Sequence, residues 1–246
     1  MFFLKEKKQK KLKYILFTYP KSGGICLVDL AGLHSLSVEM HGGMLTLATI
    51  CILATVIAKI HFRNRRTSDK YGSFWPMDSL MGKISRYTEP TAYLAGIGGV
   101  IGLVASAVIG IYVWPLELIT SSTLGLNKVM FSVFATELWI IFVVLRSKYG
   151  ESLWKNNGLA TVYSCLALIG FLFSVLAGSY GAHMALKGSI LDPIYGLFGI
   201  DILSFGVTGF NYTIILIAVS LVLIIVPIVA VLYIQRRRKI KDTAKS

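Results

Sequence analysis

The sequence has few charged residues for its length. Asp, Glu, Lys and Arg make up 15% of its 246 residues, whereas 55% of the residues are hydrophobic. A soluble domain carries roughly 25% charged residues, so this chain lacks the polar groups that a water-exposed surface needs. The composition disfavours a soluble enzyme, a disordered chain and a coiled coil, and it predicts a membrane protein.

Cysteine is also scarce. Cys26, Cys51 and Cys165 lie far apart in apolar segments and form no Cys-x-x-Cys pair. We interpret them as small packing residues that indicate no particular redox compartment. The nucleophile elbow, the Walker loop and the His-Glu-x-x-His motif are absent from the sequence. Nothing in it therefore supports hydrolase or ATPase activity, and whether the protein is an enzyme stays open.

Five segments are long and apolar enough to cross a membrane. A hydrocarbon core about 30 Å thick needs roughly 20 apolar helical residues. Each crossing must be a helix, because lipid offers backbone amides no hydrogen-bond partner, and period-two alternation is missing. The sequence predicts an all-α polytopic membrane helix bundle of about five transmembrane helices. The expected spans are approximately Val38–Phe62, Pro90–Val113, Val129–Leu145, Gly158–Leu186 and Tyr212–Gln235.

The basic residues follow the pattern of membrane topology. The net charge of +13 could suggest a nucleic-acid partner, but Lys and Arg lie in blocks beside apolar runs. Fifteen of them fall in segments 63–86, 146–155 and 236–245, whereas only Lys128 and Lys187 fall in the opposite loops. Because cytoplasmic loops carry the excess of Lys and Arg, we expect a multi-pass protein of the cell membrane. Its C-terminus should be cytoplasmic, and it should bind no nucleic acid.

The chain divides into a helical core and terminal segments. The basic N-terminal segment should lie at the interface or form a poor sixth crossing. Asp29 and the stretch from Pro20 to Gly24 disfavour a clean crossing, since a charge at the centre of a span costs about 2.5–3.5 kcal/mol. The expected parts are the N-terminal segment 1–35, a four-helix membrane core 36–187, an outer re-entrant or surface loop 188–211, the last transmembrane helix 212–235 and a basic tail 236–246.

Two histidines are candidates for a cofactor site. His41 opens the first span and His183 closes the fourth, so both should lie in the outer leaflet on antiparallel helices. Two facing imidazoles can supply the two axial ligands of a haem iron. The pattern predicts a haem b site with His41 and His183 as metal ligands. Neighbouring glycines would admit the flat macrocycle and two lysines would pair with its propionates: Gly42, Gly43, Gly178, Gly181, Lys128 and Lys187.

Other interpretations of the histidines stay open. Histidines near helix ends often bond head groups, water or a loop carbonyl, and Met40, Met44 and Met184 are alternative soft ligands. His34 lies one heptad before His41, so a copper or zinc site with Asp29 and Glu39 is conceivable, although the spacing matches no metal motif. His61 lies about 30 Å from His41 along the helix, at the opposite membrane surface.

Glu137 lies in the middle of the third span. A carboxyl group at this depth is costly and usually faces protein or water. It is a candidate for proton relay or quinol contact, and a protonated structural role is an equal alternative. In the second span, Gly98 and Gly102 form a Gly-x-x-x-Gly pair, which predicts tight helix packing.

Three stretches resemble a family of small bacterial and archaeal integral membrane proteins classed as a domain of unknown function. The likeness covers roughly residues 34–190 and implies a haem b role, with His41 and His183 as the best ligand pair. The sequence departs from the family where Pro should follow His34, and where Glu39 and Asn127-Lys128 stand in place of histidines. The matching stretches are His34-Ser-Leu-Ser-Val-Glu-Met-His41, Ile109-Gly-Ile-Tyr-Val-Trp-Pro115 and Gly178-Ser-Tyr-Gly-Ala-His183.

These observations favour a b-type cytochrome-like membrane subunit. It would pass electrons between the quinone pool and a partner at the outer face, within the lipid bilayer and with other subunits of a membrane complex. The alternative is a non-catalytic structural or assembly subunit. A small transporter is less favoured, because broken helices and paired intramembrane charges are not evident in the sequence.

Overall fold

The computed structural model describes residues 30–68, 76–202, 206 and 209–222. Most of the basic N-terminal segment, the end of the last expected span and the basic tail therefore lie outside the described residues. The possible sixth crossing lies there too.

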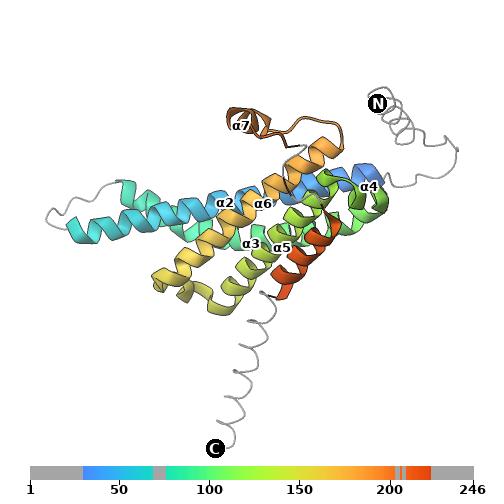
Figure 1. The fold of residues 1–246 in the computed structure, drawn as a ribbon. Coiled ribbons are helices and arrows are strands. Elements are labelled where there is room, and N and C mark those ends of the chain that lie inside the picture. The colour runs from blue at the N-terminus through green and yellow to red at the C-terminus, as the bar shows by residue number, and fades with distance from the viewer. Residues whose placement is uncertain (1–29, 69–75, 203–205, 207–208, 223–246) are drawn as a thin grey trace, which may run out of the picture.

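The described part of the chain is all-α and contains four long apolar helices (Figure 1). By length and composition each of the four could cross a membrane. The expected all-α class is confirmed, and the bundle is that of a multi-pass membrane protein. Five crossings are not shown, because only Phe210–Val222 of the last expected span is described as a helix. The four helices are α2 (Leu30–Ser68), α3 (Pro76–Val113), α5 (Thr123–Tyr149) and α6 (Asn157–Met184).

Two helices begin earlier than expected. The helix α2 begins at Leu30 rather than Val38, so it includes the end of the segment expected at the interface. The helix α3 begins at Pro76 and carries Pro90 in its interior. Pro90 was expected to start the span, as Pro often does. In a bundle, neighbouring groups can satisfy the backbone carbonyl that an interior Pro leaves free.

Short elements reverse the chain between the long helices. The helix α4 (Leu116–Ser121) joins α3 to α5, and the 3₁₀ turn η1 (Gly150–Lys155) joins α5 to α6. Asn156 caps α6, because its side-chain oxygen accepts the amide protons of Gly158 and Leu159 at 2.9 and 3.2 Å. Gly150 ends α5 with a φ of 54°, a conformation that glycine adopts without a steric penalty.

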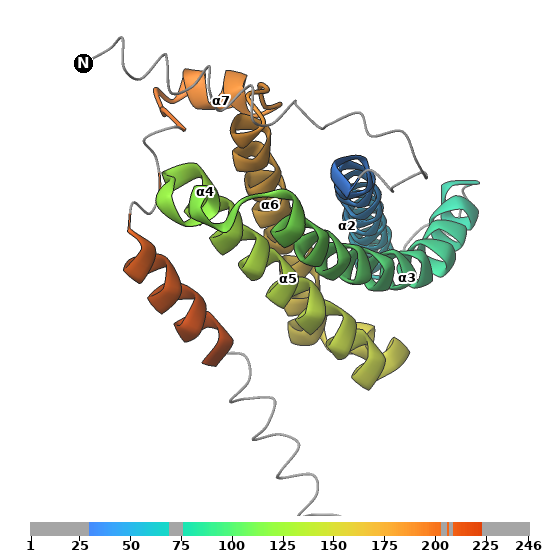
Figure 2. The same cartoon turned by 90° about the vertical axis from the view of Figure 1, so that its right-hand side faces the viewer.

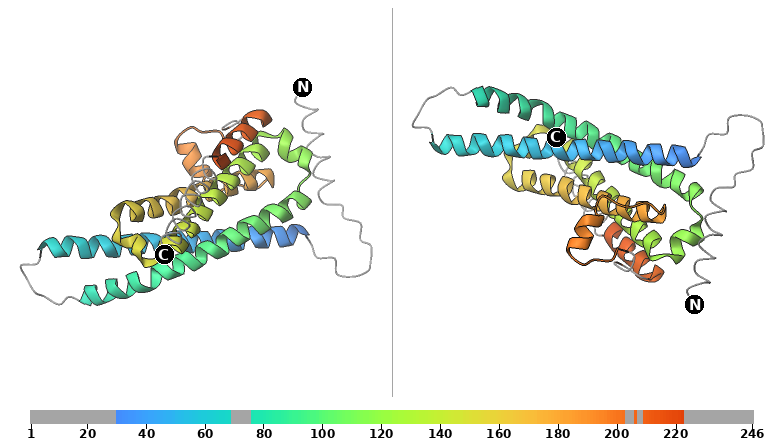
Figure 3. Two further views of the ribbon diagram at one scale, coloured as in Figure 1. Left: turned by 90° about the horizontal axis from the view of Figure 1, so that it is seen from below. Right: turned by 90° about the horizontal axis from the view of Figure 1, so that it is seen from above.

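The long helices alternate in direction and form two closely packed pairs, α2 with α3 and α5 with α6 (Figure 3). We call one end of the bundle the histidine end: α2 and α5 begin there, and α3 and α6 end there. The opposite end is the arginine end. The short helix α7 (Asp192–Leu197) lies beyond the end of α6, and the Phe210–Val222 helix runs alongside α5 (Figures 1 and 2). Whether segment 188–211 is a re-entrant or a surface loop stays a prediction.

Glycines of α3 receive side chains of α2. A methyl group built on Gly99 would overlap the side chain of Leu45. At Gly102 it would lie 2.6 Å from His41 Cβ, and at Gly110 it would lie 3.1 Å from His34 Cε1. The predicted role of the Gly98–Gly102 pair in tight helix packing is therefore confirmed. Glycine is needed here because the two helices approach closely.

Aromatic residues fill the centre of the bundle nearer the arginine end. Phe142 of α5 stacks on Tyr163 of α6 with ring centroids 4.1 Å apart, and Trp139 meets Phe142 edge to face at 5.0 Å. All three are fully buried. These contacts join α5 and α6 to the α2–α3 pair through one core cluster.

Candidate functional site

Lys128 lies where the four long helices meet at the histidine end. Its Nζ is 5.4 Å from the centre of the Trp114 ring, one residue beyond the end of α3. Its charge is close enough to act on the imidazole of His34 in α2. A methyl group on Gly181 of α6 would lie 3.3 Å from Lys128 Cε and 3.4 Å from its Nζ. Lys128 was expected in a loop, but it belongs to the second turn of α5.

Several side-chain nitrogens at the histidine end are buried without a hydrogen-bond partner. Among the described residues, they are Nε1 of Trp114 and Nδ1 of both His34 and His41; other such atoms, for example Nε1 of Trp139 and of Trp154, lie elsewhere in the bundle. No described carboxylate pairs with Lys128. A buried polar group without a partner costs about 1–3 kcal/mol, so such groups are rare unless a ligand, an ion or water satisfies them. The histidine end is therefore the strongest candidate for a binding site.

His41 lies in the interface between α2 and α3. Its Cβ and Cα face Gly102, and its ring interacts electrostatically with that of His34. The sequence assigned His34 only to a conceivable copper or zinc site. Within the described ranges, no three His, Cys, Asp or Glu side chains are grouped as metal binding would require, and Asp29 falls outside those ranges.

His183 is held by an acidic residue of the following loop. Its Nε2 lies 2.9 Å from Oδ1 of Asp192, the first residue of α7. The other carboxylate oxygen of Asp192 accepts the amide proton of Ser189 at 2.8 Å. This amide, and secondly His183, lowers the pKa of the Asp192 carboxyl below its ordinary value. The carboxylate joins the end of α6 to α7, a contact that the sequence analysis missed.

The glycines predicted to admit a macrocycle differ in their surroundings. A methyl group on Gly42, Gly43 or Gly178 would meet nothing within 4 Å, whereas Gly181 is covered by the side chain of Lys128. The contacts of His41 and His183 given above do not include each other, so their pairing stays a prediction. Lys187 is exposed just beyond the end of α6.

Glu137 has a hydrogen-bonding partner in the last described helix. It is 7% exposed, and Ser220 donates a hydrogen bond of 3.0 Å to its Oε1. Ser220 is also within 2.8 Å of the carbonyl oxygen of Ile217. The bond to Ser220 gives Glu137 a structural role, and a role in proton or quinol chemistry stays a prediction.

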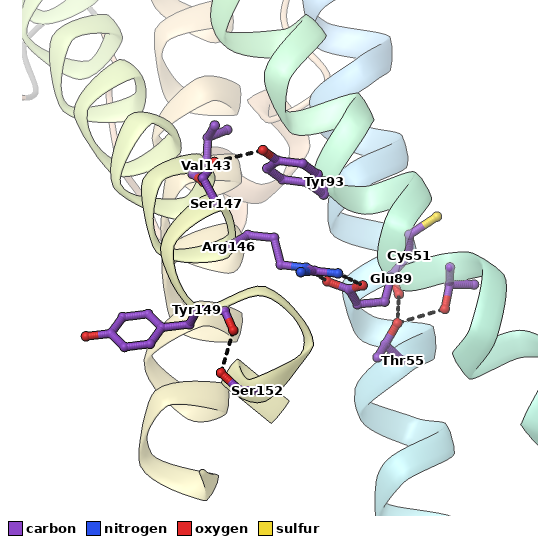
Figure 4. A network of polar contacts seen from close by, with 10 residues as sticks. Cys51, Thr55, Glu89, Tyr93, Val143, Arg146, Ser147, Tyr149 and Ser152 are labelled. Carbon is purple, nitrogen blue, oxygen red and sulfur yellow. Dashed lines mark hydrogen bonds and ion pairs between the residues drawn. The ribbon is translucent and has the colours of Figure 1, made fainter. Parts of the chain in front are cut away.

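The arginine end contains a buried ion pair. Arg146 of α5 binds both carboxylate oxygens of Glu89 in α3: Nε contacts Oε1, and Nη2 lies 2.7 Å from Oε2 (Figure 4). The two side chains are 14% and 8% exposed. The pair joins two candidate membrane-crossing helices, but its depth in a membrane is not tested, so the expected absence of paired intramembrane charges stays a prediction. Arg146 had been taken for a cytoplasmic loop residue, but α5 extends through it to Tyr149.

Hydroxyl groups add further contacts between helices at this end. The hydroxyl oxygens of Tyr93 in α3 and Ser147 in α5 lie 2.7 Å apart (Figure 4). The hydroxyl oxygens of Thr55 in α2 and Thr88 in α3 also lie 2.7 Å apart. Glu89 directly precedes the second expected span and Arg146 directly follows the third, so antiparallel crossings place both at the same membrane surface; this was the signal for the pair in the sequence.

No protein-family model matches the sequence, no curated protein is significantly similar to it, and no solved structure is significantly similar to its fold. The resemblance to the family of unknown function therefore stays a prediction.

Proposed function

We propose that this protein is a b-type cytochrome-like subunit of a membrane complex. One observation carries the proposal: the histidine end combines donor nitrogens without partners, an unpaired cation and open space beside glycines. Lys128 contacts Trp114 and Gly181 and acts on His34, which in turn interacts with His41. His183 lies two residues after Gly181 on α6, and α6 packs against α2.

The two candidate ligands have different support. His41 has a buried Nδ1 with no partner among the described residues. His183 is bonded through Nε2 to Asp192. Metal-ligating histidines commonly bind a carboxylate with the nitrogen that does not face the metal. In this arrangement Nδ1 of His183 would be the nitrogen that holds the iron. Haem, when bound, would supply one-electron transfer. The chain would orient it: Gly42, Gly43 and Gly178 leave room, and Lys128 and Lys187 supply positive charge for the propionates.

The absorption spectrum of the purified protein tests this proposal. The dithionite-reduced minus oxidised spectrum of protein purified in mild detergent should show a b-type signature, and His41→Ala or His183→Ala should abolish it. His61→Ala, at the other end of α2, is the matched control and should leave the spectrum unchanged. The proposal fails if the wild-type protein has no Soret band after haem supplementation.

The proposed electron path needs an orientation. We propose that the arginine end and the C-terminus face the cytoplasm, supported by the excess of Lys and Arg near that end. The partner protein would then act at the histidine end, and a quinone would exchange electrons within the bilayer. In a cysteine-free background, Ser121→Cys should react with an impermeant thiol reagent from outside intact cells, and Ser246→Cys should not. Reaction of both from outside would contradict this orientation.

A non-catalytic structural or assembly subunit is the second candidate. The packing of His41 on Gly102 and the Asp192 contact of His183 support it, because both histidines then have structural explanations. A colourless wild-type protein that stays folded and associates with other subunits would favour this role.

A further inference from the structure

Three side chains from three helical elements lie near one another at the histidine end: the donors Lys128 and Trp114, and the imidazole of His34. His34 packs on Gly110, and Trp114 lies one helical turn after Gly110 on the same side of α3. Lys128 lies over the Trp114 ring and acts on His34. We call these three residues the Lys128 cluster.

The cluster presents positive charge and hydrogen-bond donors. An ammonium group has three donors and no acceptor, and the indole nitrogen only donates. Nε1 of Trp114 and Nδ1 of His34 are buried and have no partner among the described residues, and no described carboxylate reaches Lys128. The ligand that satisfies such a set is an oxyanion, because it offers several acceptor lone pairs and a negative charge.

The depth of the cluster indicates the class of oxyanion. His34 lies four residues after the first residue of α2, Lys128 five residues after the first residue of α5, and Trp114 one residue past α3. At a rise of about 1.5 Å per residue, all three lie within about 8 Å of the helix ends. We infer that the cluster lies near the lipid phosphates, because Trp is enriched at the membrane–water interface and the cluster is near the ends of candidate membrane-crossing helices.

We propose that the Lys128 cluster is a binding site for one phosphate group, supplied by an anionic lipid head group or by free phosphate. The charge of Lys128 provides most of the attraction, and the indole N–H of Trp114 donates a hydrogen bond to a phosphate oxygen. His34, whose ring bonds to the backbone of Ser106, borders the site. Phosphate binding itself needs no haem, but Lys128 is also the proposed propionate partner, so a bound haem would compete with phosphate for it. It would keep the four helix ends together, because the ligand replaces the missing carboxylate partner of Lys128.

Lipid retention tests the proposal. The wild-type protein is purified in mild detergent, mixed with phosphatidylglycerol or phosphatidylcholine, and weighed by native mass spectrometry. One phosphatidylglycerol should be retained in preference to phosphatidylcholine. Lys128→Met should lower the retained fraction about tenfold or more, since a charge-assisted bond is lost, whereas Lys128→Arg should largely keep it. Lys155→Met, which removes an exposed lysine at the arginine end, is the control and should bind like the wild type.

Trp114→Phe is the second variant, because it removes one N–H and keeps the aromatic ring; it should lower retention several-fold.

Thermal unfolding with inorganic phosphate distinguishes the two sources of the phosphate group, a lipid head group and free phosphate. If millimolar phosphate raises the unfolding temperature of the wild type but not of Lys128→Met, and lipid is not retained, free phosphate is the ligand. Equal retention by Lys128→Met and Lys155→Met, with no effect of phosphate on either, would overturn the proposal. Absorbance records haem content in each sample, so this result is independent of the cytochrome test.

Discussion

The two ends of the helix bundle treat buried charge in opposite ways. At the arginine end, Arg146 meets both oxygens of Glu89, and the charge of Lys59 acts on the same carboxylate. At the histidine end, Lys128 has no described carboxylate partner and lies among donor nitrogens. A paired charge holds helices together within one chain. An unpaired cation among donors needs a group from outside the described part of the chain.

The arginine end is therefore suited to stability, and the histidine end to binding. An ion pair in a desolvated place is tolerated only where geometry and hydrogen bonds compensate for lost hydration, and the two-pronged contact of Arg146 with Glu89 satisfies this condition. No such compensation exists around Lys128 within the described residues. Substitutions at four places in the bundle test this difference between the two ends.

Removing Glu89 should have the largest effect. Glu89→Gln leaves the Arg146 charge buried without its carboxylate, which should destabilise the protein by about 3–5 kcal/mol. Thermal unfolding in detergent measures the change. The double variant Glu89→Gln with Arg146→Met should recover much of the loss, because no unpaired charge then remains. Glu151→Gln, at an exposed position of η1, is the control and should stay within about 0.5 kcal/mol of the wild type. A fully stable Glu89→Gln protein would remove the contrast between the ends.

Gly102→Ala should have the next largest effect. The added methyl group would lie 2.6 Å from His41 Cβ and 3.3 Å from His41 Cα, so α2 and α3 must move apart, at a cost of about 1–3 kcal/mol. The same change at Gly82 of α3 meets nothing within 4 Å and should be neutral or slightly stabilising. The unfolding temperatures of Gly102→Ala and Gly82→Ala, each compared with the wild type, measure the two effects. Equal stability would show that close approach of the two helices is not needed.

The bond between Glu137 and Ser220 should contribute less. Ser220→Ala removes the hydrogen bond to Glu137 and should cost about 1 kcal/mol. Glu137→Gln should change stability little, because the amide oxygen still accepts from Ser220. The rate of quinol-linked electron transfer separates the two roles of Glu137. A several-fold lower rate in a folded Glu137→Gln protein supports proton or quinol chemistry, and an unchanged rate leaves only the structural role.

The smallest effect concerns pH at α7. The folded-state pKa of Asp192 is lowered by the Ser189 amide and by His183, so the ionised carboxylate stabilises the contact between α6 and α7. That contribution is present above the ordinary Asp pKa of about 3.9 and is lost as the pH falls through the lower folded-state value. Hydrogen exchange at Ser189 should therefore accelerate below about pH 4. Asp192→Asn should exchange without this pH dependence, and an equal dependence in both proteins would rule out the role of Asp192.

Much of the fold followed from the sequence because bilayer crossing imposes strong local rules. Apolar length predicted four long helices that the structure contains, and Gly98 and Gly102 predicted a close helix contact. The alternation of helix directions also indicated that the chain around His41 and around His183 belongs to the same end of the bundle. These inferences need only the hydrophobicity of a segment and the order of segments, both of which can be read from the sequence.

The partners of individual side chains required the tertiary structure. The sequence alone determined an all-α bundle of long apolar helices with His183 at a helix end, whereas His41, expected to open its span, lies eleven residues after the start of α2. Only the tertiary structure decided that Glu89 pairs with Arg146, that Asp192 holds His183, and that Lys128 lies among Trp114, His34 and Gly181. Such contacts depend on the rotation of each helix about its axis and on its vertical position. Many weak packing contacts over the whole interface fix both, and no single motif specifies them.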